Sequence, residues 1–313
     1  SRVPFIGNFS WMSRRQSGRV AGLPYLAQLP AAGSSQPWPL VVFLHGAGER
    51  SSNKKGDLDL LKRHGPWDAD AFLVVAPQCP CSRVWPALAR QVVFFTKSIA
   101  ASFSVDAKRV HITGLSMGAF GCFAAATVAP TLFSSLVGLC GGFAPELADE
   151  ATVATLRKLA GETPALEGIK KLRRLPVWLF HSKQDKVIPS SGSVRTVRAL
   201  KALDTRAAET KLTNYDGAAH SPIGKRAYSD RLYRWMLQKR CKGKDQKVTG
   251  VQFQLGRKRT FNVRLASGKG AQKRTYGGSF RQLRQAESRA RQMKEQLKSK
   301  RQRQTKPAAA LRI

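Results

Sequence analysis

Acidic residues are scarce in this sequence of 313 residues, which has 19 Asp and Glu against 54 Lys and Arg and a formal net charge of +35. The imbalance is uneven along the chain. Residues 1–240 contain 33 basic and 16 acidic residues, whereas residues 241–313 contain 21 and 3. The last quarter of the chain therefore holds half of the excess charge, which indicates a compositional boundary near Cys241.

Cysteine is also rare, and its odd count of five without framework spacing excludes a disulfide scaffold. Cys79 and Cys81 are too close in sequence for an ordinary bridge, and no matching histidine pair completes a zinc site. Cys122 and Cys140 lie in apolar surroundings and are interpreted as inert core thiols. We therefore predict no metal and no cofactor, and an intracellular enzyme that is cytoplasmic, with nuclear and organellar locations as alternatives.

Long apolar runs are absent: nothing approaches the roughly 18 residues that a membrane span requires, so we predict none. The first residue is Ser1 rather than methionine, so we expect a fragment or a processed product. A targeting segment upstream of Ser1 stays open on this basis.

Short runs rich in Val, Ile, Leu and Phe alternate with helix-like stretches up to residue 240. The runs predict strands at Leu40–His45, Phe72–Pro77, Val110–Leu115, Leu136–Gly141, Val177–His181 and Lys211–Tyr215. The stretches between them predict helices that include Pro86–Phe103, Met117–Ala126 and Gly192–Leu203. This alternation predicts an α/β catalytic domain over residues 1–240 with a doubly wound, mostly parallel sheet. The charged insert Pro145–Arg174 is either a small lid or a surface helix pair.

The basic C-terminal part predicts a separate small α+β module. Residues 241–249 are interpreted as a linker, residues 250–300 as three strands and a helix, and residues 301–313 as a disordered tail. The strands are two short runs within Gly250–Leu265 and a third at Thr275–Phe280. The helix is Gln282–Lys298, where apolar residues recur every three or four positions.

The motif with the clearest chemistry is Gly114-Leu115-Ser116-Met117-Gly118, which follows a predicted strand and opens a predicted helix. A nucleophilic serine needs such a sharp turn between strand and helix, and Gly114 and Gly118 permit the close packing there. The helix also directs its first amides at developing negative charge. Ser116 is therefore the candidate nucleophile.

A serine hydroxyl needs a base to take its proton and an acid to orient that base, in the chain order serine, acid, histidine. Of the five histidines, His181 would lie too close to the acid and three others do not follow Ser116, so His220 is the candidate base. Asp185 lies just past a buried strand, at the sheet edge where such sites form, and is the candidate acid. Asp204 and Asp216 are less suitable, because Asp204 belongs to a helical pattern and Asp216 precedes His220 closely.

The segment His45-Gly46-Ala47-Gly48-Glu49-Arg50 directly follows another buried strand. Hydrolysis of an acyl group passes through an oxyanion, and backbone amides stabilise it. The amides of Ala47 and Met117 are the expected pair, supported by His45, Gly46 and Gly48. Arg50 is expected to pair with Glu49 or to reach a carboxylate on the substrate.

Three segments resemble the carboxylesterase, phospholipase and predicted-peptidase branch of the α/β-hydrolases: residues 39–50, Ala76-Pro77-Gln78-Cys79-Pro80, and residues 113–121. Residues 176–181 with Asp185, and the closing Tyr233-Arg234-Trp235-Met236-Leu237, continue the likeness over about residues 20–240. Ala119 and Ser182 stand where that family often has glycine. The resemblance implies hydrolysis of carboxylic esters, with relatives that act on thioesters or peptides.

Residues 250–298 resemble the Apetala-type (ethylene-response-factor) DNA-binding domains, through Gly250-Val251, Phe261, Gly277-Gly278-Ser279-Phe280, Ala286-Glu287 and Ala290. The tryptophans usual in the strands of that family are missing here. The clusters Arg257-Lys258-Arg259 and Lys273-Arg274 could neutralise phosphates of DNA or RNA. A solvated basic tail, or a helix that binds a protein partner, is the alternative.

Three functions compete at this point. The first is a serine hydrolase that cleaves small carboxylic esters and carries a basic appendage. The second is a nucleic-acid-binding protein with a hydrolase scaffold, which the intact set Ser116, Asp185 and His220 disfavours. The third is a serine peptidase of the prolyl-oligopeptidase type, although no propeller domain precedes the hydrolase in this sequence.

Overall fold

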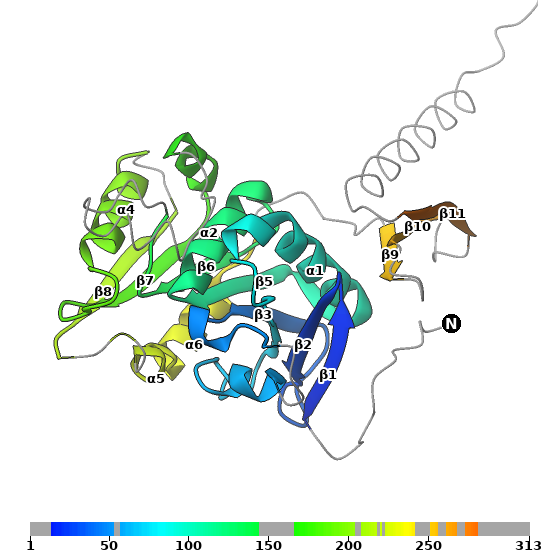
Figure 1. Cartoon of the computed structure of the whole chain (residues 1–313), viewed down its shortest axis with the longest axis horizontal. Helices are drawn as coiled ribbons and strands as arrows, with labels where there is room; N and C mark the ends of the chain where they lie inside the picture. Colours follow the sequence, from blue (N-terminus) through cyan, green and yellow to red (C-terminus); the bar gives the residue numbers. More distant parts are fainter. Residues whose placement is uncertain are drawn as a thin grey trace, which may run out of the picture. The chain divides into compact units, whose positions relative to one another are not determined.

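The computed structural model describes residues 14–52, 57–143, 166–203, 208–217, 220 and 223–241, together with three strands beyond residue 250. The chain divides into two compact units, residues 1–244 and residues 245–313. Each unit is described by itself below (Figure 1).

An eight-stranded sheet forms the framework of the first unit, with the order β1-β2-β4-β3-β5-β6-β7-β8. From β4 to β8 neighbouring strands run parallel, whereas β2 is antiparallel to both β1 and β4. The strands are β1 (Arg15–Val20), β2 (Leu23–Gln28), β3 (Trp38–Leu44), β4 (Leu73–Pro77), β5 (Val105–Leu115), β6 (Ser135–Leu139), β7 (Val177–Ser182) and β8 (Thr210–Tyr215). The six predicted strands are confirmed with shifted ends, and β1 and β2 are additional.

Helices cover both faces of this sheet. The predicted helices are confirmed as α1 (Ala89–Ser102), which follows a short 3₁₀ turn, α2 (Met117–Val128) and α4 (Ser191–Lys201). These three lie on one side of the sheet, and α5 (Ile223–Ala227) and α6 (Asp230–Gln238) lie on the other (Figure 1). The sheet is therefore doubly wound and mostly parallel, as predicted.

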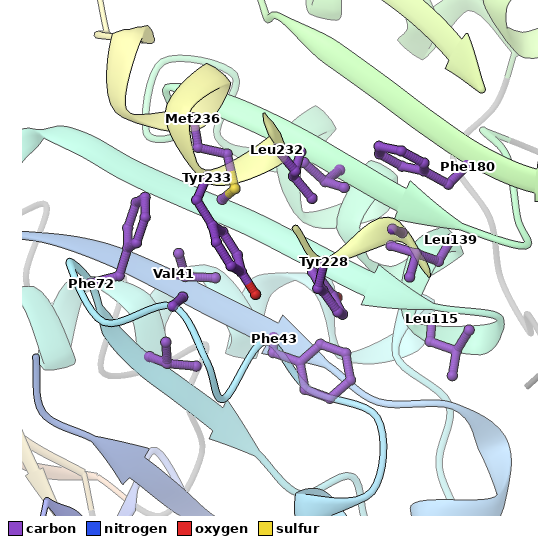
Figure 2. Packing of buried hydrophobic residues seen from close by; sticks show 14 of the residues in the cluster. Val41, Phe43, Phe72, Leu115, Leu139, Phe180, Tyr228, Leu232, Tyr233 and Met236 are labelled. Carbon is purple, nitrogen blue, oxygen red and sulfur yellow. The ribbon is translucent and has the colours of Figure 1, made fainter. Parts of the chain in front are cut away.

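The core under α5 and α6 fixes these last helices onto the sheet. Leu232, Tyr233 and Met236 of α6 point down to Val41 and Phe43 of β3 (Figure 2), and all five side chains are buried. The sequence of α6 explains why this helix packs on the sheet: its apolar residues form one face of the helix and its charged residues form the opposite face.

Within the insert Pro145–Arg174, residues 145–165 lie outside the described part of the chain. The described remainder contains a 3₁₀ helix, Leu166–Leu172. In the part of the chain that the structure describes, no helix is both long and apolar enough to cross a bilayer.

The second unit contains a three-stranded antiparallel sheet with the order β11-β10-β9. Its strands are β9 (Val251–Leu255), β10 (Phe261–Ser267) and β11 (Lys273–Phe280). They correspond to the two strands predicted within Gly250–Leu265 and to the third, which begins two residues before the predicted Thr275. The proposed helix Gln282–Lys298, most of the linker and the tail 301–313 lie outside the described residues.

Candidate active site

The candidate residues follow the carboxyl ends of neighbouring parallel strands. Leu44 at the end of β3 pairs with Gly114 of β5, and Leu115 of β5 pairs with Leu139 at the end of β6. The segments that begin at residues 45, 116 and 140 therefore leave the same edge of the sheet together. Asp185 follows β7, and His220 follows β8. This is the edge at which open α/β sheets build their sites.

Ser116 occupies the turn between β5 and α2 with a strained backbone. Its φ is 54° and its ψ is −118°, which side-chain-bearing residues rarely adopt. The Ser116 amide donates to the Leu139 carbonyl oxygen at 2.7 Å, which holds the turn against the end of β6. The residue is 6% exposed, so its hydroxyl is sheltered at the end of a strand. This geometry is that of a nucleophile elbow.

The glycines of the motif are required by close packing on two sides of this turn. A Cβ at Gly114 would lie 2.5 Å from the Gly118 carbonyl group, and a Cβ at Gly118 would overlap the Leu44 carbonyl oxygen. Helix α2 thus begins in direct contact with the end of β3. The alanine at position 119 fits because Gly138 and Gly141 face its Cβ.

Asp185 and His220 are joined by a short hydrogen bond, with Nδ1 of His220 2.6 Å from Oδ2 of Asp185. The other carboxylate oxygen, Oδ1, accepts from the amides of Val187 at 2.8 Å and Ile188 at 2.9 Å. Burial would raise the pKa of Asp185, but hydrogen bonds from His181, His220 and the Ile188 amide outweigh burial and hold the pKa well below its usual range. Asp185 is therefore ionised, and its carboxylate is hydrogen-bonded to the ring of His220. The rejected candidate Asp216 lies on the surface, where it forms an ion pair with Lys183.

The loop after β3 lies beside the nucleophile turn. A Cβ at Gly46 would approach the Leu115 carbonyl oxygen at 3.8 Å, so this loop packs against the residue that precedes Ser116. Ala47 is the first residue of a 3₁₀ helix and Met117 the first of α2. The amide of the first residue of a helix has no acceptor carbonyl within that helix. Both amides suit an oxyanion hole, and nothing crowds Gly48 between Ala47 and Glu49.

His45 fixes this loop and has no free nitrogen for acid–base chemistry. Nε2 of His45 accepts from the Cys79 amide at 2.9 Å, so the proton is on Nδ1, which lies 2.6 Å from the Gly46 carbonyl oxygen. Burial lowers the pKa of His45 to about 4. The Gly46 carbonyl belongs to the same peptide group as the Ala47 amide, so this bond sets the direction of that amide. His45 thus holds the loop after β3 in place as a neutral donor.

Glu49 and Arg50 differ from the expectation. Instead of an ion pair between them, Glu49 turns inward and its Oε2 accepts from the Gly46 amide at 2.8 Å. Arg50 instead donates to the carbonyl oxygens of Ala47 at 3.1 Å and Cys81 at 3.2 Å. The expected ion pair was wrong because neighbours in sequence need not share a surface: Glu49 is 3% exposed, while Arg50 reaches across the loop. Contact of Arg50 with a carboxylate on the substrate stays a prediction.

Two residues beside the site were not recognised from the sequence. His181 contacts the same oxygen of Asp185 as His220 does, with Nε2 3.3 Å from Oδ2. Cys140 donates from Sγ to the His220 carbonyl oxygen at 3.4 Å. Potential ligand atoms of Cys140, His181 and Asp185 lie within 4.8 Å of one another, as in a metal site. Each of the three side chains already has hydrogen-bond partners in the protein, so together they form a closed network around the acid.

The basic residues singled out in the second unit are only partly described. Lys273 and Arg274 begin β11, at register positions opposite Ser267 and Ala266 of β10. Residues 257–259 lie outside the described part. Nothing in the geometry of this unit tests contact with nucleic acid, which stays a prediction.

Comparison with known proteins bears on the first unit. The family model of the prolyl oligopeptidase family matches residues 87–241. No curated protein matches the chain at a significant level. A thermostable esterase is similar in structure, with 23% identity and a TM-score of 0.55 over 70% of this chain and 59% of that one. The acylaminoacyl peptidase of Pyrococcus horikoshii is similar with 19% identity and a TM-score of 0.51, over 71% of this chain and 40% of that one.

An S-formylglutathione hydrolase from Agrobacterium tumefaciens is also similar, with 17% identity and a TM-score of 0.54, over 76% of this chain and 99% of that one. This chain thus spans only part of the esterase and of the peptidase, but nearly the whole of the last hydrolase. At these identities the likeness shows the fold. The family match and these neighbours together support a serine hydrolase. Together with the sheet order and the turn at Ser116, these likenesses show that the first unit has the α/β-hydrolase fold.

Proposed function

We propose that the protein is a serine hydrolase that cleaves small carboxylic esters through an acyl-enzyme on Ser116, with His220 as base and Asp185 as the orienting acid. The observation that carries this proposal is the 2.6 Å hydrogen bond between Asp185 and Nδ1 of His220. That bond places the Nδ1 proton toward Asp185 and leaves Nε2 as the nitrogen that accepts the serine proton.

In the first half of the reaction, Oγ of Ser116 attacks the ester carbonyl carbon while its proton moves to Nε2 of His220. The carbonyl oxygen becomes an oxyanion, which the amides of Ala47 and Met117 stabilise. One such donor is worth about 10²-fold to 10³-fold in rate. Collapse expels the alcohol oxygen, which takes the proton from His220, and the acyl group stays on Ser116. Water then attacks the carbonyl carbon of the acyl-enzyme and gives its proton to His220. Collapse releases the carboxylic acid and returns the proton to Oγ of Ser116.

Hydrolysis of an ester or thioester rather than a peptide bond is supported by how the neighbours align, since S-formylglutathione carries its acyl group on sulfur. The chain covers 99% of the S-formylglutathione hydrolase but only 40% of the acylaminoacyl peptidase. A serine, histidine and aspartate arranged as proposed for Ser116, His220 and Asp185 would also suit amides and thioesters. The match of residues 87–241 to the prolyl oligopeptidase family makes a peptidase the second candidate.

A substrate panel separates these candidates. Full-length protein and the Ser116→Ala variant are assayed with p-nitrophenyl esters of increasing acyl length, an acyl thioester and aminoacyl p-nitroanilides. We expect the highest kcat/KM for a short ester, and loss of all three activities in Ser116→Ala. A higher kcat/KM for the anilides than for the esters would favour the peptidase over the esterase. An activity that survives Ser116→Ala would reject the proposed nucleophile.

A further inference from the structure

His181 stands at the carboxyl end of β7 with a fully buried side chain. Its Nδ1 lies 2.7 Å from Oγ of Ser193 in α4, and its Nε2 lies 2.8 Å from the Ile188 carbonyl oxygen. The same Nε2 is 3.3 Å from Oδ2 of Asp185, the oxygen that His220 also contacts. Asp185 thus lies between two imidazoles.

The protons in this network can be assigned from the partners. A carbonyl oxygen only accepts, so Nε2 of His181 must carry a proton to bond Ile188. Oγ of Ser193 lies 2.7 Å from the Gly141 carbonyl oxygen, which likewise only accepts, so the single hydroxyl proton of Ser193 is used there. Nδ1 of His181 must then be the donor to Ser193. In this assignment both ring nitrogens of His181 carry protons, which describes an imidazolium.

We propose that His181 is a buried cation that holds Asp185 ionised and in place, and so acts as a positioning residue of the catalytic triad. This inference rests on the proposed function, because Asp185 matters to the reaction only as the acid partner of His220.

A buried imidazolium requires a nearby anion, and among the residues that the structure describes the charges around His181 include one, that of Asp185. Asp185 contacts His181 directly. Burial raises the pKa of the Cys140 thiol, and so does the Asp185 carboxylate, so the thiol stays neutral. On α4, the buried residues Ser193 and Thr196 are uncharged, while Arg195 and Arg198 are exposed. The Asp185 carboxylate therefore offsets the charge of His181.

This arrangement has a consequence for His220. When His220 takes the serine proton, it becomes positively charged. Nδ1 of His220 and Nε2 of His181 contact the same oxygen, Oδ2 of Asp185, so these two nitrogens lie about 6 Å apart at most. The two cations repel, which favours return of the proton to the leaving alcohol. Removing the charge of His181 therefore makes His220 hold its proton up to higher pH, where it cannot act as a base.

The variant His181→Gln removes the charge but keeps an amide donor for Asp185 and Ile188. With a p-nitrophenyl ester, we expect the acid limb of its kcat/KM profile to move to higher pH by about one unit, with KM nearly unchanged. The variant His181→Ala removes the donor as well, and we expect its kcat to fall by a further factor of about 10 or more. The matched control is His111→Gln, because His111 is equally buried and bonds a serine hydroxyl, Ser135, but stands in β5 away from Asp185. It should leave the acid limb unshifted.

A second measurement does not depend on activity. In full-length protein with ¹⁵N-labelled histidine, the resonances of His181, identified by their loss in His181→Gln, should show two protonated nitrogens at pH 7. One unprotonated nitrogen there, or an unshifted acid limb in His181→Gln, would overturn the inference. Activity that survives Ser116→Ala would instead reject the proposed function, and the nitrogen resonances would still decide the protonation of His181.

Discussion

Gly118 packs directly on the carbonyl oxygen of Leu44, so the start of α2 and the end of β3 touch through backbone atoms. This contact explains how two segments about 70 residues apart in sequence come close enough for the proposed oxyanion hole. Ala47 follows Leu44 by three residues, and Met117 precedes Gly118 by one. No side chain separates the two segments at this contact, which supports the proposed pairing of their amides.

A methyl group at position 118 should therefore disrupt both the fold and the site. We expect Gly118→Ala to lower the free energy of unfolding by about 3 kcal/mol or more, since the clash is with backbone that cannot move aside. Gly48→Ala, in the loop after β3, is the matched control, because a Cβ there meets no atom within 4 Å. Urea unfolding of the two variants checks this, and equal stability of Gly118→Ala and wild type would contradict the packing described here.

The acid of the triad can be distinguished from its competitor. Asp185→Asn should lower kcat by about 10²-fold to 10⁴-fold, because the amide cannot hold the tautomer of His220 that the reaction needs. Asp216→Asn should retain nearly full activity, since Asp216 is exposed and bound to Lys183. His220→Ala should be as damaging as loss of Ser116, because the two act as a unit. Steady-state kinetics on a p-nitrophenyl ester measures all three, and a larger loss in Asp216→Asn than in Asp185→Asn would reassign the acid.

The buried Glu49 should make stability depend on pH. Burial raises the pKa of Glu49 to about 7, although the Gly46 amide and Arg63 oppose this. Between the ordinary value of 4.5 and about 7 the folded protein retains a proton that the unfolded chain has lost, so stability falls as the pH rises through this range.

The variant Glu49→Gln cannot ionise and should escape this loss. From pH 4 to pH 8, its free energy of unfolding should rise relative to wild type by up to about 3 kcal/mol. Glu167→Gln, at an exposed glutamate, is the control and should follow wild type. Denaturant titrations at the two pH values provide the comparison. A stability difference that does not change with pH would show that Glu49 ionises normally.

The basic second unit should bind nucleic acid through phosphates rather than bases. We expect full-length protein to bind DNA or RNA with an affinity that falls steeply with salt and depends little on sequence. Replacing Arg257, Lys258, Arg259, Lys273 and Arg274 by glutamine should reduce the salt slope and leave ester hydrolysis unchanged. Titrations of a labelled oligonucleotide at two salt concentrations measure this. If full-length protein shows no salt-sensitive binding, the helix proposed over Gln282–Lys298 is better tested as a protein-binding element.

Most of the sheet could be predicted because its central strands are buried on both faces and appear as unbroken apolar runs, as in β4 and β7. Strands β1 and β2 could not. The sequence of β1, Arg15–Val20, is polar and alternates between exposed and half-buried residues, and β2 pairs with it antiparallel at the sheet edge. Such strands form because they pair with neighbouring strands, which the local sequence does not reveal.

The site shows the same division. Ser116, Asp185 and His220 could be proposed from motif and chain order, which follow from the fold's topology. His181 was set aside because it stands close to the acid, yet that closeness is what brings its Nε2 to Asp185. The inward turn of Glu49 was equally hidden, because it depends on burial of the loop rather than on neighbours in sequence.

The most direct test of the proposed nucleophile is covalent labelling of full-length protein with a fluorophosphonate probe, followed by mass-spectrometric mapping of the adduct. The probe reacts with a serine only where a base and an oxyanion hole activate it. We predict one adduct, on Ser116, that is absent from a folded Ser116→Ala variant and strongly reduced in His220→Ala. An adduct on another residue, or labelling that persists in Ser116→Ala, would contradict the account.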